Sequence, residues 1–169
     1  LMKNMVLNLI LVPIVIPGII GGIILLIFFG YADIKPSIFT TVLVAHVNWV
    51  LPFAFLTIYP RLHHFDLSLE EAALDLGARP IQIFWKIVFP IVLPGIIGTT
   101  LFSFSLSLDE FIRTIFVVGY QRTMPVQFWS MIVDDLAPEL PAMAVLVIFA
   151  SVITALLGFA YANRASAKV

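Results

Sequence analysis

The sequence contains no cysteine and very little charge. Charged residues make up only 11% of its 169 residues, and the formal net charge is −1. Without cysteine the chain has no disulfide, no thiolate metal site and no cysteine nucleophile, which fits a compartment where disulfides are not used. Without an excess of positive charge it has no overall field that would attract nucleic acid. These absences exclude disulfide-rich secreted proteins, thiol enzymes and nucleic-acid-binding proteins.

The sequence also lacks the motifs of nucleotide hydrolysis and of common hydrolases. A phosphate-binding loop has the form G-x-x-x-x-G-K-[S/T], but none of the lysines is followed by serine or threonine. No Ser-His-Asp or H-E-x-x-H constellation stands out. His46 lies inside a hydrophobic run and His63-His64 lie beyond its end, so haem held between facing histidines is not expected. We therefore expect no catalytic residue, no metal site and no cofactor in this chain.

Long hydrophobic runs dominate what is present. Hydrophobic residues form 62% of the sequence and the mean hydropathy is +1.11, against about 45–50% apolar residues in a soluble domain. A core of this size could not bury that surplus. The runs are continuous, as in helices that cross a membrane. We therefore expect an all-α membrane protein, a polytopic helical bundle with one transmembrane domain, 1–169, and four spans at about 5–29, 38–59, 91–118 and 142–162.

Small residues and prolines predict how two of these spans are shaped and packed. Pro17 and the adjacent glycines predict a kink or a break in the first span. The fourth span has small residues four apart, Ser151/Ala155 and Gly158/Ala162. Such pairs allow close contact with another helix.

The distribution of basic residues predicts the orientation in the membrane. The arrangement with both ends and a loop at about 60–90 in the cytoplasm agrees with the positive-inside rule. It places Lys3, Arg61, Arg79, Lys86, Arg164 and Lys168 inside and only Lys35 and Arg122 outside. The loop at about 119–141 then lies on the outer side. Its middle, Val126 to Leu136, is apolar and predicts a helix at the membrane interface.

Residues 70–90, "EEAALDLGARPIQIFWKIVFP", interrupt the hydrophobic runs. Ser68 and Glu71 form a capping-box pattern that predicts a helix starting at about Leu69. This helix is only about two turns long, which makes it marginal alone. Its apolar residues, Leu69, Ala72, Ala73 and Leu76, share one narrow face. Two interpretations stay open: insertion of this face into a partner's groove, and an interfacial helix that only stiffens the loop.

The rest of the interruption predicts a stop and a second helix. Gly77 follows the short helix where a left-handed residue ends it, a conformation that costs glycine little. Pro80 can then occupy the first position of a second helix, "PIQIFWKIVF". Pro90 and Pro94-Gly95 are expected to turn the chain into the third span.

Three charged residues, Asp109, Glu110 and Arg113, lie within the expected third span. Charges at this depth are costly and usually face a water-filled path or a partner. Arg113 can pair with Asp109 at i,i+4 or with Glu110 at i,i+3, but it cannot neutralise both acids. The acids are therefore candidates for a gate or contact site on a cation pathway. The alternative is a structural ion pair near the outer mouth.

Other polar residues in the spans have weaker interpretations. His46 and Asn48 could line the path, although a lone histidine in a span is more often packed and hydrogen-bonded than a ligand. Ser103, Ser105 and Ser107 alternate, so they do not share one helix face. Some of them are expected to bond back to their own helix.

Residues 71–90 resemble the EAA motif of permease subunits of bacterial ABC importers. That motif reads E-A-A, three residues, G, nine residues, I-x-L-P. It is matched by Glu71-Ala72-Ala73, Gly77, Ile87 and Pro90, with Phe89 in place of the usual leucine. The flanks "SFSLSLDEFIRTIFVVG" and "TMPVQFWSMI" resemble the polyamine-type (spermidine/putrescine) permeases. The resemblance covers essentially the whole chain. It implies the type I importer permease fold, which normally has six spans, so we expect an N-terminal part to be missing.

The resemblance implies a role for the loop and for the acids. In that family the loop is the coupling helix that docks on an ATPase subunit, and the positions carried over are Glu71, Ala72, Ala73 and Gly77. Polyamine-type relatives carry acids in the segment that holds Asp109 and Glu110, which favours a substrate pathway or gate there.

The resemblance also implies a location and partners. They are the bacterial inner membrane with its lipids, cytoplasmic ATP-binding subunits that hold ATP and Mg, a second permease subunit in a heterodimer, and a periplasmic substrate-binding protein. The leading hypothesis is a permease subunit of an ATP-driven importer for a small cationic or amino-bearing, polyamine-like solute. Two rivals remain: an ion-coupled secondary transporter using Asp109 and Glu110, and a membrane scaffold that transports nothing. The exact solute stays open.

Overall fold

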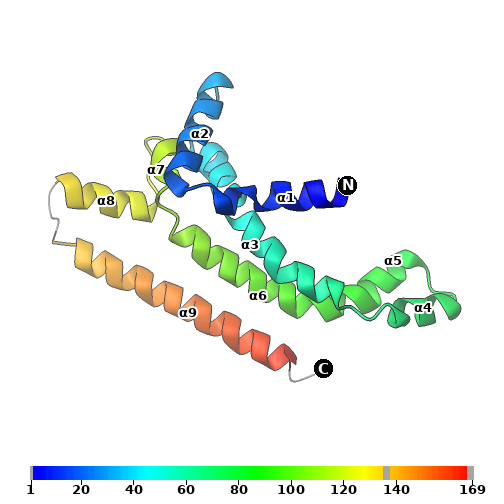
Figure 1. Cartoon of the computed structure of the whole chain (residues 1–169). Coiled ribbons are helices and arrows are strands. Elements are labelled where there is room, and N and C mark those ends of the chain that lie inside the picture. Colours follow the sequence, from blue (N-terminus) through cyan, green and yellow to red (C-terminus); the bar gives the residue numbers. More distant parts are fainter. Residues whose placement is uncertain (1, 135–137, 167–169) are drawn as a thin grey trace.

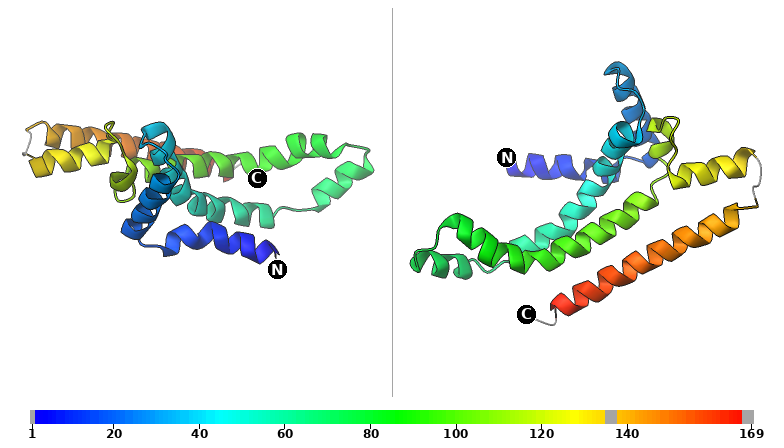
Figure 2. Two further views of the ribbon diagram at one scale, coloured as in Figure 1. Left: turned by 90° about the horizontal axis from the view of Figure 1, so that it is seen from above. Right: turned by 180° about the vertical axis from the view of Figure 1, so that it is seen from behind.

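The computed structural model of the chain describes residues 2–134 and 138–166. Every regular element in these ranges is helical, so the prediction of an all-α chain is confirmed. The helix α6 packs against both α3 and α9, and the three run side by side (Figures 1 and 2). Shorter helices lie beyond both ends of the α3–α6 pair (Figure 1). The bounds are α3 Leu43–His63, α6 Phe89–Leu108, α9 Leu140–Ser166, with α4 Ser68–Asp75 and α5 Pro80–Ile83 at one end and α7 Thr114–Val117 and α8 Met124–Asp134 at the other.

The first hydrophobic segment is broken into α1 (Met2–Val15) and α2 (Gly18–Tyr31), which meet at an angle of 109°. The break comes at Pro17, whose φ of −51° and ψ of 138° are extended rather than helical. The predicted break is therefore confirmed. The two halves have different neighbours: α1 packs on α3, and α2 packs on α7 (Figure 1). By length and composition, three helices in the described part can cross a membrane, or four if this bent pair counts as one span.

The third span differs from the prediction at both ends. A continuous helical segment runs from Pro80 to Leu108, so the expected turn at Pro90 and the span 91–118 are both wrong. A π-helical turn, Phe84–Val88, precedes Pro90, and the Phe89 N–H donates to the Phe84 carbonyl five residues back. This wider turn accommodates the proline and lets the helix continue. The helix ends instead at Leu108, before the charged residues.

The second and fourth spans agree with the prediction and are longer. A π-helical turn, Ile38–Val42, leads into α3, which continues to His63. Helix α9 contains the predicted span 142–162. A Cβ atom placed on Gly158 would lie 3.3 Å from the Cβ of Leu101 in α6, so the predicted close contact of small residues is confirmed there. The side chain of Ala162 lies outside the described part of the chain.

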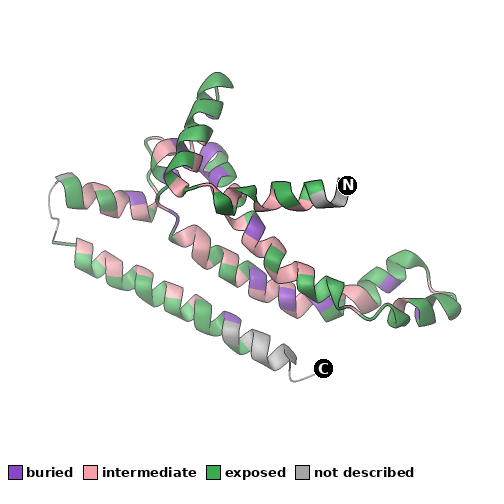
Figure 3. Ribbon diagram, in the orientation of Figure 1, coloured by how far each residue is buried: buried purple, intermediate pink, exposed green. Residues whose placement is uncertain are grey.

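A small cluster of buried apolar residues lies where α2, α7 and the start of α3 with its leading π-helical turn meet. It consists of Phe29, Val42, Ala45 and Val117. The Thr41 hydroxyl, also fully buried, donates a 2.7 Å hydrogen bond to the Val117 carbonyl and ties the start of α3 to α7. Elsewhere many large apolar side chains of the long helices are exposed, most of all in α9 (Figure 3). Such faces suit lipid or other membrane helices.

The predicted helix in the loop at 119–141 is present as α8. It begins two residues earlier than predicted, at Met124, and its Trp129 ring lies 5.6 Å from the ring of Phe111. This contact attaches α8 to the turn that follows α6. The predicted end at Leu136 lies outside the described residues.

Candidate functional site

The loop between α3 and α6 carries α4, and an aspartate upstream of the predicted cap fixes its start. The Asp66 carboxylate accepts the Ser68 backbone N–H at 3.0 Å. Hydrogen bonds from the Ser68 side chain and backbone lower the pKa of the Asp66 carboxyl. The predicted capping box of Ser68 and Glu71 is wrong, because Ser68 is already the first helical residue. Aspartate two residues before an N–H is a strong local acceptor, and here it takes the role assigned to serine.

The end of α4 is closed by the predicted glycine. Gly77 has a φ of +80°, the left-handed conformation that only glycine adopts without a penalty. The Ala78 N–H donates a hydrogen bond to the Ala73 carbonyl at 3.0 Å, and the Gly77 N–H donates one to the Leu74 carbonyl at 2.8 Å. This pair of bonds is a Schellman motif. The prediction for Gly77 is therefore confirmed.

The second helix of the loop starts as predicted at Pro80, the first residue of α5. Its entry is held by Gln82, whose side-chain oxygen accepts the Arg79 backbone N–H at 2.9 Å. Arg79 itself is extended, with a φ of −79° and a ψ of 149°, as expected for a residue before proline. Both turns of the loop are thus fixed by bonds between residues close in sequence.

The short helix α4 exposes most of its apolar residues. Only Ala73 is buried, whereas Glu71 and Ala72 are exposed and Leu76 is 89% exposed. The other large apolar residues of this segment, Leu67, Leu69 and Leu74, are exposed as well. A short, locally fixed helix with an unburied apolar surface suits insertion into the groove of another protein.

Asp109, Glu110 and Arg113 lie in the turn between α6 and α7, not inside a helix as the predicted span required. Asp109 directly follows the last residue of α6 and caps the helix, and its side chain is exposed. Glu110 and Arg113 are only 6% and 5% exposed. The two neighbouring acids therefore occupy different environments.

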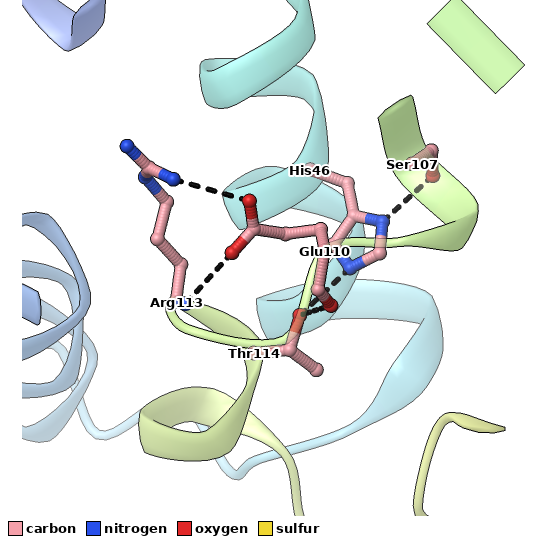
Figure 4. A network of polar contacts seen from close by, with 5 residues as sticks. All are labelled: His46, Ser107, Glu110, Arg113 and Thr114. Atoms are coloured by element: carbon pink, nitrogen blue, oxygen red, sulfur yellow. Dashed lines mark hydrogen bonds and ion pairs between the residues drawn. The ribbon is translucent and has the colours of Figure 1, made fainter. Parts of the chain in front are cut away.

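Glu110 and Arg113 form a buried ion pair. The Glu110 Oε2 atom accepts from Arg113 Nη1 at 3.1 Å, and its Oε1 accepts the Arg113 backbone N–H at 2.8 Å (Figure 4). Of the two pairings that the sequence allowed, this is the one present. Asp109 has no ion pair within the described residues.

Arg113 also contacts two other helices. Its guanidinium carbon lies 3.9 Å from the ring centre of Trp49 in α3, a cation–π geometry. The glycines of α2 also lie close to Arg113: a Cβ atom on Gly22 would be 3.2 Å from the Arg113 Cα, and one on Gly21 would be 3.5 Å from its Nε. Asn48 and Arg113 both line a cavity of about 200 Å³ at the α1–α2 bend.

His46 joins α3 to both ends of the same turn. Its Nδ1 lies 2.7 Å from the Ser107 hydroxyl and its Nε2 lies 2.8 Å from the Thr114 hydroxyl (Figure 4). The Thr114 hydroxyl donates its proton to the Glu110 carbonyl at 2.9 Å, so it must accept from Nε2–H. The network thus places a proton on Nε2. The interpretation of His46 as a packed, hydrogen-bonded residue is confirmed.

A groove of about 420 Å³ between α3 and α6 is lined by His46, Ser103 and Ser107 among apolar residues. Ser105 instead lines a second cavity, of about 490 Å³, that α3, α6 and α9 enclose. The serines therefore do divide between faces. The predicted bond from a serine back to the helix is not found among the described residues: the Ser103 hydroxyl has no partner and the Ser107 hydroxyl bonds to His46. Thr100 makes such a bond instead, and its hydroxyl donates to the Ile96 carbonyl at 2.8 Å.

Three residues of these two regions escaped the sequence analysis: Asp66, Trp49 and Thr114. An acid two residues before a serine at a helix start is a recognisable turn signal, so Asp66 could have been found. Nothing local marks Trp49 or Thr114, because their partners lie 64 and 68 positions away along the chain.

The family described as binding-protein-dependent transport system inner membrane component matches residues 1–166. The chain is 38% identical over 114 residues to the spermidine/putrescine transport system permease protein PotC of Haemophilus influenzae, a match that covers 67% of this chain and 44% of that protein.

Two proteins of Escherichia coli are similar to the same degree. The spermidine/putrescine transport system permease protein PotC is 34% identical over 116 residues, covering 68% of this chain and 44% of the relative. The putrescine transport system permease protein PotI is 38% identical over 109 residues, covering 64% and 39%. The chain thus spans less than half the length of these relatives.

Proposed function

Because the chain belongs to the family of binding-protein-dependent transport system inner membrane components, we propose that it is a transmembrane subunit of an ATP-driven importer. The importer moves a small cationic or amino-bearing, polyamine-like solute across the bacterial inner membrane by alternating access. The names of the similar proteins, which refer to spermidine and putrescine, support an amine as the solute.

One observation carries the proposal: α4 is fixed at both ends by local bonds and yet buries only Ala73 within the chain. A helix held in this way keeps its shape by itself, but within the described residues most of its apolar surface is not covered. We assign the groove that would cover it to a cytoplasmic ATP-binding subunit, which binds ATP and Mg and hydrolyses the nucleotide. The coupling residues are Glu71, Ala72, Ala73 and Gly77.

Asp109 and Glu110 belong to the solute pathway or its gate in this proposal. The exposed carboxylate of Asp109 can meet a cationic group of the solute directly, since it has no ion pair within the described part of the chain. Glu110 acts through Arg113, which it holds beside Trp49. The turn that carries them joins α6 to α7, so a tilt of α6 would move the acids.

Further partners follow from the same proposal. A second permease subunit, in a heterodimer, would cover part of the exposed apolar surface of the long helices, and lipid would cover the rest. A periplasmic solute-binding protein would dock on the outer side, where we place α8. In this orientation the loop with α4 is cytoplasmic.

ATP dependence of uptake is the test. The complete complex, with its ATP-binding subunits and binding protein, is reconstituted in vesicles and supplied with labelled putrescine or spermidine. We expect uptake with ATP and none with a non-hydrolysable analogue. Uptake driven by a proton or sodium gradient without ATP would overturn the proposal in favour of a secondary transporter. Unchanged uptake in the double variant Asp109→Asn/Glu110→Gln would remove these acids from the mechanism.

A further inference from the structure

Arg113 fills a site that has the chemistry of a binding site for an ammonium group. Both carboxylate oxygens of Glu110 accept hydrogen bonds from Arg113, at 2.8 and 3.1 Å. The guanidinium carbon also lies 3.9 Å from the ring centre of Trp49. A carboxylate beside an aromatic face is the combination that holds organic cations. In this chain the cation is part of the protein.

The glycines of α2 lie against this arginine. Cβ atoms on Gly18 and Gly21 would lie 3.4 Å from its Nη1 and 3.5 Å from its Nε, which are ordinary van der Waals distances. The glycine face of α2 and the indole of Trp49 therefore both contact the arginine side chain.

The charges in the turn do not balance. The turn carries two carboxylates, Asp109 and Glu110, and one base, Arg113, with histidine counted as neutral at pH 7. Glu110 is already neutralised and buried. One negative charge is left, on the exposed side chain of Asp109. The turn can therefore neutralise one further positive charge.

We propose that Arg113 is a specificity-determining residue that limits the solute to one ammonium group at this level of the pathway. It occupies the carboxylate and the aromatic face that would otherwise bind a second ammonium group. This inference rests on the proposed function, because it concerns the same solute pathway. It predicts that this importer prefers solutes with one ammonium group over solutes with two. The preference should be stronger than in an importer where the carboxylates of Asp109 and Glu110 are both free.

The test compares two solutes of equal length in the reconstituted complete complex. Putrescine carries two ammonium groups, and 4-amino-1-butanol carries one ammonium group and one hydroxyl. The KM for uptake of each is measured for the wild type, Arg113→Gln, Arg113→Lys and the double variant Glu110→Gln/Arg113→Gln. All four complexes use the same binding protein, so its own preference cancels when KM ratios are compared.

We expect Arg113→Gln to shift the KM ratio about tenfold in favour of putrescine, the effect of one additional partly buried ion pair. Arg113→Lys should keep the wild-type ratio because the tethered charge remains. The double variant should show the wild-type KM ratio again, because Asp109 is then the one charged residue left of Asp109, Glu110 and Arg113. A purely structural arginine would alter uptake of both solutes equally and leave the ratio unchanged.

The outcomes separate this inference from the proposed function. A wild-type complex that imports no amine refutes the proposed function. A complex that imports amines with the same KM ratio in wild type and Arg113→Gln refutes only the role of Arg113. A wild-type complex that imports putrescine and excludes the amino alcohol also refutes that role, because it would already require two ammonium groups.

Discussion

The loop with α4 and the turn between α6 and α7 both interrupt long helices, but local contacts hold the loop and long-range contacts hold the turn. In the loop, Asp66, Gly77 and Gln82 bond to groups a few residues away, and the surface stays exposed. In the turn, His46 and Trp49 reach across from α3 to hold buried partners. The loop is therefore shaped by its own sequence, and the turn by the helices around it.

This difference separates two tasks. A segment that must dock on another protein needs a shape of its own and an unburied surface, which α4 has. A segment that must respond to movement of the helices needs contacts with several of them. The turn has such contacts, because Arg113 and Thr114 touch partners in different helices. Local changes should therefore affect the loop, and changes in distant helices should affect the turn.

The largest expected effect comes from breaking the buried ion pair. Glu110→Ala leaves the Arg113 guanidinium buried without its carboxylate, which should lower the free energy of unfolding by about 3–5 kcal/mol. Asp109→Ala is the matched control, since it removes the exposed acid next to it. Thermal unfolding of the purified complex in detergent measures both. Equal melting temperatures of the two variants would contradict the distinction between the acids.

Removing the histidine that ties the turn to α3 should have the next largest effect. His46→Leu leaves the hydroxyls of Ser107 and Thr114 without their partner, a loss of about 1–3 kcal/mol in stability. His63→Leu, at the exposed end of the same helix, is the control and should change little. The same unfolding measurement applies. A His46→Leu variant as stable as His63→Leu would show that the turn does not depend on α3.

A change inside the loop should act on coupling rather than on overall stability. Gly77→Val places a β-branched residue at a φ of +80°, which costs about 1–2 kcal/mol, so the end of α4 should unfold or shift. We expect ATP hydrolysis without matching uptake. Gly77→Asn, which tolerates this conformation better, should retain most of the coupling. No atom lies within 4 Å of a Cβ atom on Gly77, so the backbone alone carries the effect.

The number of solute molecules taken up per ATP hydrolysed measures this coupling. A Gly77→Val complex with the wild-type ratio would contradict the role of the left-handed turn.

The smallest expected effect is a pH dependence at the start of α4. The pKa of Asp66 is lowered from its ordinary value of 3.8 by its hydrogen bonds with Ser68. A lowered pKa in the folded state means that the carboxylate stabilises the helix above pH 3.8 and that this contribution is lost as the pH falls through the lowered pKa. Amide hydrogen exchange over residues 66–71, corrected for its intrinsic pH dependence, should therefore show constant protection from pH 7 to 5 and a loss below about pH 4.

The variant Asp66→Asn is the control for this pH dependence. It keeps a side-chain acceptor but removes the titrating group, so protection should no longer change with pH. A decline between pH 7 and 5 in the wild type would contradict the assignment to Asp66.

The same contrast explains which features the sequence could predict. Gly77 and Pro80 were predicted correctly because glycine and proline restrict or free the backbone at their own positions. The all-α architecture was also predicted correctly, because the length and continuity of each hydrophobic run indicate a helix without reference to the rest of the chain. The cap at Asp66 was missed by two residues, because the Glu71 N–H that a capping Ser68 would bind already donates to the Leu67 carbonyl.

The turn could be predicted only as a set of candidate residues. The sequence allowed Arg113 to pair with either acid, and the choice of Glu110 depends on the position of Trp49 and of the α2 glycines. The end of α6 at Leu108 was missed because the serines and apolar residues before and after it resemble a continuing span. Pro90 was assumed to end a helix, and the π-helical turn that accommodates it has no sequence signal of its own.

That continuous helical segment has a mechanical consequence. It is 29 residues long, from Pro80 to Leu108, which corresponds to about 44 Å at the usual rise. One end adjoins the turn at Gly77 and the other adjoins Asp109. A helical segment of this kind acts as a lever: a push on the loop that tilts it also displaces the acidic turn, and the π-helical turn at Phe84–Val88 is where it would bend. The distance between the two regions is thus bridged by one lever arm.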